Sequence, residues 1–334
     1  MCDPRVVVVI PNRNGLRHLQ CCLPSLRESV EGGVRTLLID DASTDESCSF
    51  VAANHPWVTI LRQFKNRGFA ACVNLGLRWA LGDGAAYVAV LNSDVRVPAG
   101  FLEPVVAYLD RAPQVAVAGF QEVNEQGARG VILPERIEFV DVGTKLPGML
   151  YVCRLHAIAD VGFYDEAYFM YGEEVDLFDR LTRAGFAIVQ SNVPVWHFVS
   201  GSRETAPIRI AWYSYRNFIR FALKTGGILD LARNAAVSLY YGLSRTRTPA
   251  GRTWLGQLLS RGRADHGSQT TRSAFHLRVR RFDLGNRLVN LVFWFAALAW
   301  NAIALPAIMT ARRRDSKLIK LARARMLSET REQS

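Results

Sequence analysis

Carboxylate and amide side chains follow three apolar runs of the sequence. They are Asn12 and Asn14 after the first run, Asp40 and Asp41 after the second, and Asn92, Ser93 and Asp94 after the third. Oxygen ligands of this kind bind a divalent cation, which in turn holds a diphosphate. Such a cation would neutralise the charge that builds on a departing nucleotide diphosphate. Each group alone could instead form a turn, because Asn, Ser and Asp are common turn residues. A binding site therefore requires that the three groups lie close together in the folded chain.

Side chains near the second run could recognise a nucleotide. A carboxylate at Asp40 or Asp41 could accept the N3 hydrogen of a uracil or thymine and so select the base. Asp45, a few residues on, is explained as well by capping the helix that follows. Lys65 and Arg67 precede another predicted helix, where they could meet a phosphate or simply lie in a solvated loop.

A second group of acids, Glu173, Glu174 and Asp176, falls on the first turn of a predicted helix. Negative charge there is favoured by the helix dipole, which would explain all three residues without any chemistry. Alternatively, one of them removes a proton from an incoming hydroxyl group. His197 could ligate the same cation as Asp94, although a lone histidine beside a tryptophan is more often a packed core residue.

Alternating elements position these residues. Buried strands are predicted at residues 5–11, 34–39, 58–61 and 87–91, and helices at 16–29, about 45–53 and 69–80. This alternation predicts a parallel, doubly wound sheet. Ligands gather at the carboxyl ends of such strands. The polar ends after residues 11, 39 and 91 therefore converge on one crevice if their strands adjoin.

The next part of the chain is more mixed. The pattern predicts helices at 101–111, 154–161 and from residue 173, and strands at 115–120, 145–153, 187–189 and 193–195. The polar segment 122–141 is assigned to a hairpin or loop.

Charge is distributed unevenly over the 334 residues. Residues 1–202 have a net charge of −6 and residues 203–334 one of +17, which together give +11. A basic region of this kind suits an anionic surface such as a lipid leaflet or a nucleic acid. The six cysteines form no CxxC pair, so the sequence favours a reduced, cytosolic environment, and we expect no signal peptide before the first strand.

Two apolar stretches, 228–243 and 288–309, follow in the basic region. The second is long enough to span a membrane, but arginines flank it on both sides, which argues against a simple span. We expect amphipathic helices lying on the cytoplasmic face of the plasma membrane as a peripheral anchor. The alternative is a soluble helical subdomain or a homodimer interface. The predicted domains are 1–225, catalytic, and 226–334, basic and helical.

The sequence resembles the family-2 glycosyltransferases of the GT-A fold, especially the bacterial rhamnosyltransferase-like branch that extends cell-surface glycans. The matching segments are, in order, VVIPNRNG, LLIDDASTDES, NRGFAACVNLGL, VLNSDVRV, GFYDEAYFMYGEEVDLFDRLTRAGF, VWHFVSGS and WYSYRNFIRF. They cover roughly the first two-thirds of the chain, and seven segments in order are a specific match. The resemblance implies an α/β, Rossmann-like, mostly parallel sheet flanked by helices, here with a C-terminal basic helical extension.

The resemblance also implies roles for individual residues. Pro11 and Asn12 line the nucleotide pocket with Asp40 and Asp41. The full predicted nucleotide-binding set is Pro11, Asn12, Asn14, Asp40, Asp41, Lys65, Arg67, Gly68, Asn92 and Ser93. Asp94 and His197 hold Mg²⁺ or Mn²⁺, and Gly148, Met149 and Asp176 belong to the acceptor and sugar pocket. The family's acidic pair maps onto Glu173 and Glu174, of which Glu174 is the base.

Two positions depart from the family pattern. Glu174 stands where Asp is usual, and Asn92 replaces the first acid of the DxD-type motif. The implied reaction is an inverting transfer from a nucleotide sugar, dTDP-rhamnose or a UDP-sugar, to a lipid-linked glycan acceptor. The departures keep open a scaffold that binds nucleotide sugar without turnover.

Two further alternatives fit less well. A nucleotidyltransferase would want a Gly-rich phosphate loop after the first strand, and PNRNG is a poor version of one. A nucleic-acid-binding protein would explain the basic third but leaves the acids of the predicted crevice unexplained. We therefore expect no nucleic-acid partner.

Overall fold

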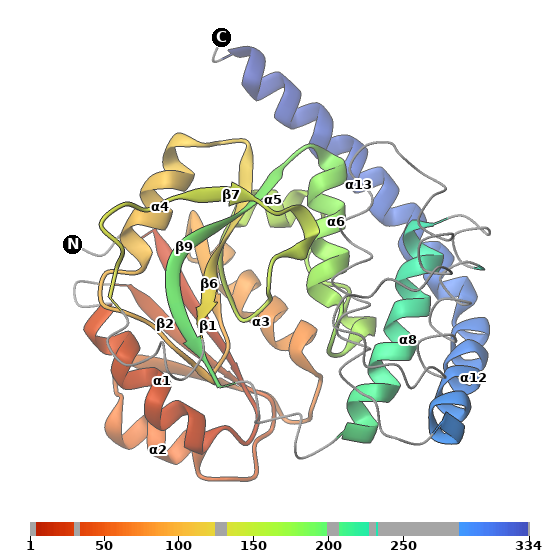
Figure 1. Cartoon of the computed structure of the whole chain (residues 1–334), viewed down its shortest axis with the longest axis horizontal. Coiled ribbons are helices and arrows are strands. Elements are labelled where there is room, and N and C mark those ends of the chain that lie inside the picture. Colours follow the sequence, from red (N-terminus) through yellow and green to blue (C-terminus); the bar gives the residue numbers. More distant parts are fainter. Residues whose placement is uncertain are drawn as a thin grey trace. The chain divides into compact units, whose positions relative to one another are not determined.

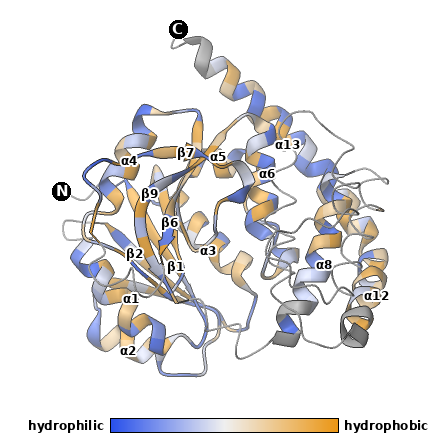
Figure 2. Cartoon of the chain, viewed as in Figure 1, coloured by the Kyte–Doolittle hydropathy of each residue, from blue (hydrophilic) through white to orange (hydrophobic). Residues whose placement is uncertain are grey.

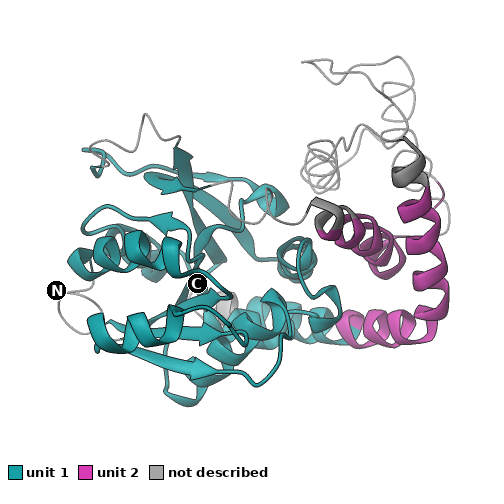
Figure 3. Ribbon diagram, turned by 90° about the horizontal axis from the view of Figure 1, so that it is seen from below, with its two compact units in different colours: residues 1–201, 317–334 teal, residues 202–316 magenta. Residues whose placement is uncertain are grey.

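The computed structural model describes residues 5–29, 34–123, 132–198, 207–226, 232 and 287–332. The chain divides into two compact units, one of residues 1–201 with 317–334 and one of residues 202–316, coloured separately in Figure 3. The first unit contains the sheet, and the described part of the second is helical. A boundary between functional domains at residue 225 stays a prediction.

Four strands form the parallel half of the sheet. They are β1 (Val6–Asn12), β2 (Arg35–Asp40), β3 (Val58–Arg62) and β4 (Tyr87–Leu91). Their spatial order is β3-β2-β1-β4, and each neighbouring pair is parallel. The doubly wound arrangement predicted from the alternation of elements is therefore confirmed, and β1, β2 and β4 adjoin as the convergence of their polar ends requires.

Helices cover both faces of this sheet, which is why its central strands are apolar throughout. All five residues of β4 are buried. One face packs against α1 (Leu16–Ser29), α2 (Ser47–Asn54) and α4 (Leu102–Arg111). The other packs against α3 (Phe69–Gly82), α5 (Leu155–Asp160) and α6 (Glu173–Ala184). Figure 1 shows α1 and α2 on one side of the strands and α3 and α6 on the other, and Figure 2 shows hydrophobic residues gathered along the strands.

The rest of the sheet mixes parallel and antiparallel pairs. Its strands are β5 (Val95–Arg96), β6 (Val115–Val123), β7 (Phe139–Asp141), β8 (Leu150–Arg154) and β9 (Ala187–His197). Strand β8 is antiparallel to both β4 and β6, whereas β6 and β9 are parallel. Strand β5 pairs antiparallel with the end of β9.

Three predictions in this half need correction. The two short strands expected at 187–189 and 193–195 are one strand, β9, which stays paired with β6 across a register shift. The strand expected from residue 145 begins only at Leu150, because Gly143–Lys145 form the 3-10 turn η1. The segment 122–141 contributes β7, while its residues 124–131 lie outside the described residues.

The helical second unit contains α8 (Pro207–Thr225), α12 (Arg287–Ile303) and the first part of α13 (Leu305–Glu332). The helical path is interrupted between α12 and α13 just before Pro306, and a proline loses no helical hydrogen bond in the first turn of a helix. Within this unit Asn301 Nδ2 donates to the Arg216 carbonyl at 2.9 Å, and the buried Lys224 Nζ lies 2.8 Å from Asp315 Oδ2.

Of the two apolar stretches near the C-terminus, the structure describes the second and only one residue of the first. Stretch 228–243 lies outside the described residues apart from residue 232, whereas 288–309 forms α12 and the start of α13. Within the part of the chain that the structure describes, no single helix has the length and apolar character to cross a membrane. The bent pair Val292–Ile303 and Leu305–Ser328, with 68° between them, meets that test only jointly.

Candidate active site

The ends of β1 and β2 bring two predicted nucleotide residues together. Their register places Asn12 beside Asp40, and Asn12 Nδ2 donates to Asp40 Oδ1 at 3.3 Å and to Ser43 Oγ at 3.3 Å. Asp40 Oδ2 accepts from the Ser43 amide at 3.1 Å and lies 3.4 Å from Arg62 Nε. The buried Asn12 Oδ1 has no hydrogen-bond partner among the described residues, so one acceptor at this strand end is unsatisfied there.

Asp41 uses its carboxylate to hold the start of α3. Oδ1 accepts from the Arg67 amide at 2.7 Å and from Gln63 Nε2 at 3.3 Å, and Oδ2 accepts from the Gly68 amide at 2.9 Å. Adjacent acids are tolerated at a strand end when amides satisfy them. The structure therefore gives Asp41 a positioning function, and base selection by either acid stays a prediction.

Other predicted nucleotide residues surround this strand end. Pro11 pairs with Ile39 in the sheet. Asn14 has a left-handed backbone (φ 52°), and its Oδ1 accepts from the Thr44 amide at 2.7 Å. Asp45 accepts from the amides of Leu16 and Ser47 at the starts of α1 and α2, but the N-cap of α2 is Glu46 and not Asp45 as predicted.

The two cations before α3 are placed differently from one another. The side chain of Lys65 is exposed. Arg67 Nη2 donates to Glu166 Oε2 at 2.7 Å, so its guanidinium pairs with a carboxylate within the chain. The phosphate contact of Arg67 stays a prediction, and its backbone amide donates to Asp41.

The segment Asn92–Ser93–Asp94 forms a tight turn between β4 and β5. The Val95 amide donates to the Asn92 carbonyl at 3.2 Å, and the Asn92 amide donates to the Met149 carbonyl at 2.9 Å. The buried Asn92 Oδ1 has no hydrogen-bond partner in the described part of the chain. The turn therefore contains a buried, unsatisfied amide oxygen two residues before Asp94.

Pairing of β5 with β9 brings His197 to Asp94. Val95 lies opposite His197 in the ladder, and His197 Nε2 lies 3.3 Å from Asp94 Oδ1. The other ring nitrogen, Nδ1, lies 3.2 Å from Glu122 Oε1. Burial alone would lower the pKa of His197, but hydrogen bonds to Asp94 and Glu122, together with their charges, outweigh burial and raise this pKa to about 9.

Glu122 was not among the predicted site residues because it lies in the segment 122–141, which was assigned to a hairpin or loop. It stands near the end of β6, which runs parallel to β9 and so reaches the same edge. A carboxylate on the far nitrogen of a metal-binding histidine fixes the ring and its tautomer. The only sequence signal was its place just after an apolar strand.

The donors at this edge are compatible with a divalent cation that also takes oxygens from a diphosphate. They are the carboxylate of Asp94, the imidazole of His197 and the buried, unsatisfied amide oxygen of Asn92. Over the described ranges, no three His, Cys, Asp or Glu side chains are arranged to hold a metal by themselves. A cation here would therefore depend on ligand oxygens for much of its coordination.

The predicted base lies against the predicted sugar pocket. Glu174 is only 4% exposed, and its Oε2 accepts from the Gly172 amide at 3.1 Å. A Cβ placed on Gly148 would lie 3.2 Å from Glu174 Cγ and 3.3 Å from Oε1, a tight contact that the glycine avoids. Met149 follows Gly148 and is tied to Asn92 through its carbonyl, whereas Glu173 is buried beside Glu174 at the start of α6.

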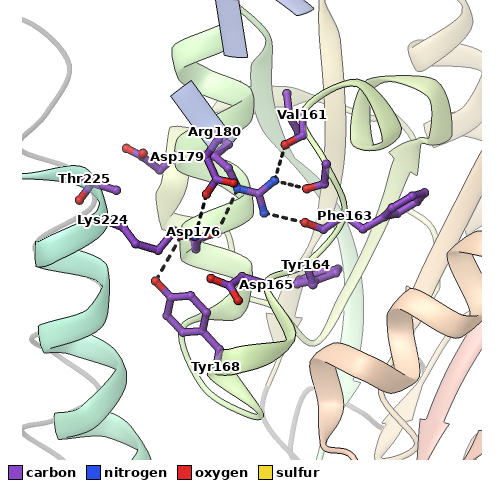
Figure 4. A network of polar contacts seen from close by, with 12 residues as sticks. Val161, Phe163, Tyr164, Asp165, Tyr168, Asp176, Asp179, Arg180, Lys224 and Thr225 are labelled. Atoms are coloured by element: carbon purple, nitrogen blue, oxygen red, sulfur yellow. Dashed lines mark hydrogen bonds and ion pairs between the residues drawn. The ribbon is translucent and has the colours of Figure 1, made fainter. Parts of the chain in front are cut away.

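Asp176 is placed elsewhere. Its Oδ1 accepts from the Tyr168 hydroxyl at 3.2 Å and its Oδ2 from Arg180 Nε at 3.0 Å, as Figure 4 shows. Arg180 also donates to the carbonyls of Val161 and Phe163 at 2.7 and 2.8 Å. With both oxygens engaged and 1% exposure, Asp176 is part of a buried ion pair rather than of the sugar pocket predicted for it.

Comparisons with known proteins agree with this geometry. The model of the family "Glycosyl transferase family 2" matches residues 7–160. The pre-mycofactocin glycosyltransferase of Mycobacterium tuberculosis is 35% identical over 54% of this chain, which spans 39% of that relative's length. The N-acetylglucosaminyl-diphospho-decaprenol L-rhamnosyltransferase of the same species is 29% identical over 57% of this chain and 74% of that protein.

Solved structures show the same fold at low identity. The Staphylococcus aureus TarS fragment 1–349 in complex with UDP-GlcNAc has a TM-score of 0.55 and 15% identity, covering 97% of this chain and 92% of that one. The mannosyltransferase PcManGT from Pyrobaculum calidifontis, in complex with GDP-Man and Mn²⁺, has a TM-score of 0.51 and 18% identity, covering 97% and 88%. The predicted GT-A fold is confirmed. Over residues 7–160 of its 334 residues, the chain is similar to glycosyl transferase family 2.

Proposed function

We propose that this protein is an inverting, divalent-metal-dependent glycosyltransferase that moves a sugar from a nucleotide-sugar donor to a hydroxyl group of a lipid-linked glycan acceptor. The observation that carries the proposal is the convergence of polar ends on adjoining strands. Asn12 and Asp40 meet at the ends of β1 and β2, and the turn carrying Asp94 follows their neighbour β4. This is the edge where ligands bind in open α/β sheets.

In the proposed reaction Glu174 takes the proton of the acceptor hydroxyl as its oxygen attacks the anomeric carbon. The nucleoside diphosphate leaves from the opposite side, and no covalent enzyme intermediate forms. The position of Glu174 against Gly148 supports this role, because the glycine leaves space next to the carboxylate oxygen Oε1. The Gly172 amide donates to the other oxygen of this carboxylate, Oε2, at 3.1 Å.

Asp94 and His197 would hold Mg²⁺ or Mn²⁺, with Asn92 adding an amide oxygen. Such an ion stabilises the negative charge that develops on a nucleoside diphosphate leaving group. Glu122 would orient the His197 ring toward Asp94 by bonding its other nitrogen. The structure of PcManGT in complex with GDP-Man and Mn²⁺ supports a divalent cation in this fold.

The relatives guide the choice of substrates. The rhamnosyltransferase relative is named for transfer of L-rhamnose to a diphospho-decaprenol-linked sugar. We propose dTDP-rhamnose as the first donor to test, with UDP-sugars second, and a polyprenyl-linked glycan as the acceptor. The protein would then act in cell-surface polysaccharide synthesis.

Metal dependence is the direct test of the proposed site. Nucleoside diphosphate release by the full chain is measured with dTDP-rhamnose, UDP-sugars and GDP-sugars, in Mn²⁺ or EDTA, with and without membrane extract. We expect release only with metal and extract, and a loss of about 10²-fold or more in Asp94→Ala, because an unneutralised diphosphate is a poor leaving group. The exposed Asp83→Ala serves as the control and should keep full activity.

Two results would contradict this assignment. Turnover in EDTA equal to that in Mn²⁺ would show that the reaction does not need a divalent metal. Donor binding without turnover under every condition would favour the nucleotide-sugar-binding scaffold instead.

We further propose that the protein acts as a peripheral protein on the cytoplasmic face of the plasma membrane. Helix α12 leaves Phe295 59% and Trp300 51% exposed, and the first half of α13 continues with Arg312, Arg313 and Arg314. Exposed aromatic side chains close to a run of cations suit insertion among anionic headgroups. A membrane seat would also bring the enzyme to a lipid-linked acceptor.

Vesicle binding tests this proposal. We expect the full chain to sediment with vesicles that contain phosphatidylglycerol but not with pure phosphatidylcholine, and high salt to weaken binding. The double variant Phe295→Ser with Trp300→Ser should bind at least about tenfold more weakly, since each side chain contributes buried apolar area. Leu81→Ser, a change at a 46% exposed leucine of α3, is the control. Unchanged vesicle binding, or a halved mass in solution for the double variant, would favour a homodimer interface.

A further inference from the structure

The segment that leads into Glu174 has a strained backbone. Phe169 and Tyr171 have φ values of 66° and 69°, and Gly172 follows at 88°. Around Phe169 the Met170 amide donates to the Tyr168 carbonyl at 2.7 Å, which makes a classic-type γ-turn, a rare and strained form. Such conformations persist only where the surrounding structure holds them.

A single buried side chain of α3 forms hydrogen bonds to the beginning of the segment 164–172, which leads to Glu174. Asn74 is fully buried, and its Oδ1 accepts from the Tyr164 amide at 2.9 Å while its Nδ2 donates to the Tyr164 carbonyl at 3.0 Å. Nδ2 also donates to Glu166 Oε1 at 3.0 Å. One amide group therefore binds both backbone polar groups of Tyr164 and a carboxylate two residues later.

The same helix is anchored at its start to the nucleotide end of the sheet. Asp41 accepts from the amides of Arg67 and Gly68, and the Ala70 amide donates to the Phe169 carbonyl at 3.3 Å. Gly68 has a φ of 83°, and a Cβ on it would overlap the Phe169 carbonyl oxygen. Helix α3 thus touches the strained segment at both Tyr164 and Phe169.

The opposite side of the segment is held by α6. Arg180 donates to the Phe163 carbonyl, and the buried Tyr168 hydroxyl donates to Asp176, as Figure 4 shows. Arg180 and Asp176 belong to the helix that carries Glu174. The contacts of Asn74, by contrast, tie the segment to the helix that begins at Asp41.

We propose that Asn74 is a positioning residue for Glu174: by clamping Tyr164 and Glu166 it holds residues 164–172 in the strained conformation that presents the base. The proposal rests on the glycosyltransferase function given above. It adds that residues 164–172, which lead to Glu174, are held from helix α3. The start of α3 is itself bound to Asp41 at the end of β2. A displacement of about 1 Å at a reacting group costs on the order of 100-fold in rate.

The test compares Asn74→Ala, Asn74→Asp and the double variant Asn74→Asp with Glu166→Gln in the full chain. We expect kcat to fall about 10- to 100-fold in Asn74→Ala, with the donor KM changed less than about threefold. Asn74→Asp should be at least as impaired, because it removes both donors and places a carboxylate against Glu166. In the double variant the amide and carboxylate exchange places, so kcat should recover by about fivefold or more over Asn74→Asp.

A second readout does not depend on activity. Hydrogen exchange of the peptide covering residues 163–172 should be at least about tenfold faster in Asn74→Ala than in the wild-type protein, because the clamp on the Tyr164 amide is lost. The control is Asn54→Ala, which removes an exposed asparagine whose Nδ2 donates to Phe50 within α2. It should change neither kcat nor exchange in this peptide.

The outcomes separate the two proposals. If the wild-type protein turns over no donor, the proposed function fails, and hydrogen exchange still tests the clamp. If the wild-type protein is active and Asn74→Ala keeps its kcat, the positioning role is overturned. It is overturned equally if kcat falls only in proportion to the fraction of unfolded protein while exchange in residues 163–172 is unchanged.

Discussion

Replacing Glu174 by glutamine is expected to lower kcat by about 10²- to 10⁴-fold, the range that general-base catalysis contributes. The amide cannot take the acceptor proton, but it has the same size and its oxygen can still accept from the Gly172 amide. The contact with Gly148 also remains. We therefore expect donor binding, measured by calorimetry, to stay within about threefold of wild type while nucleoside diphosphate release nearly stops.

The neighbouring acid provides the matched comparison. Glu173→Gln changes the same chemical group one residue earlier, at a position that is also buried. We expect a smaller loss of kcat there, because the atoms nearest to a Cβ placed on Gly148 belong to Glu174. A larger loss in Glu173→Gln would identify Glu173 as the general base. Equal activity of Glu174→Gln and wild type would show that Glu174 takes no part in the reaction.

Replacing Arg180 by methionine is expected to lower the free energy of unfolding by about 3–5 kcal/mol, the cost of leaving one partner of a buried ion pair uncompensated. Arg180 and Asp176 are 2% and 1% exposed. The change also removes the donors to the carbonyls of Val161 and Phe163. Equilibrium unfolding in urea should show a lower midpoint with an unchanged slope.

An ion pair of the same spacing on the same helix is the control. Arg183 lies 3.5 Å from Asp179, again four residues apart, but Arg183 is 45% exposed. We expect Arg183→Met to cost no more than about 1 kcal/mol, because exposed pairs are screened by water. Equal effects of the two changes would show that the Arg180 network adds nothing beyond a surface pair. Adding Asp176→Leu to Arg180→Met should recover part of the loss, since it removes the unpaired charge.

The residues Glu174 and Arg180 lie on the same helix, α6. Helix α6 carries Glu174 in its first turn and Arg180 in its second, so the residue proposed for chemistry is held by the residues that stabilise the fold. Variants of Arg180 are therefore expected to lose activity through unfolding, whereas Glu174→Gln should lose activity while fully folded. Thermal unfolding measured beside kcat distinguishes the two.

The sequence by itself determined the parallel half of the sheet and the place of its polar ends. The strands β1, β2 and β4 were visible as apolar runs because strands covered on both faces need apolar side chains at every position. Helices α1 and α3 were visible through apolar residues at helical spacing. These are local patterns, and the alternation of strand and helix leaves few topologies to consider.

Only the tertiary structure decided which side chains meet. Glu122 reaches His197 because β6 and β9 lie side by side although 75 residues separate the pair, and no local pattern reports that distance. Asp176 and Glu174 both appear in the sequence as acids of a first helical turn, yet Arg180 engages one and Gly148 lies against the other. A phosphate contact was predicted for Arg67 from its charge. In the structure its guanidinium pairs with the carboxylate of Glu166, 99 residues further along the chain. Composition and spacing define what a side chain can do, but its partner is set by contacts between distant segments, which form only when the chain packs.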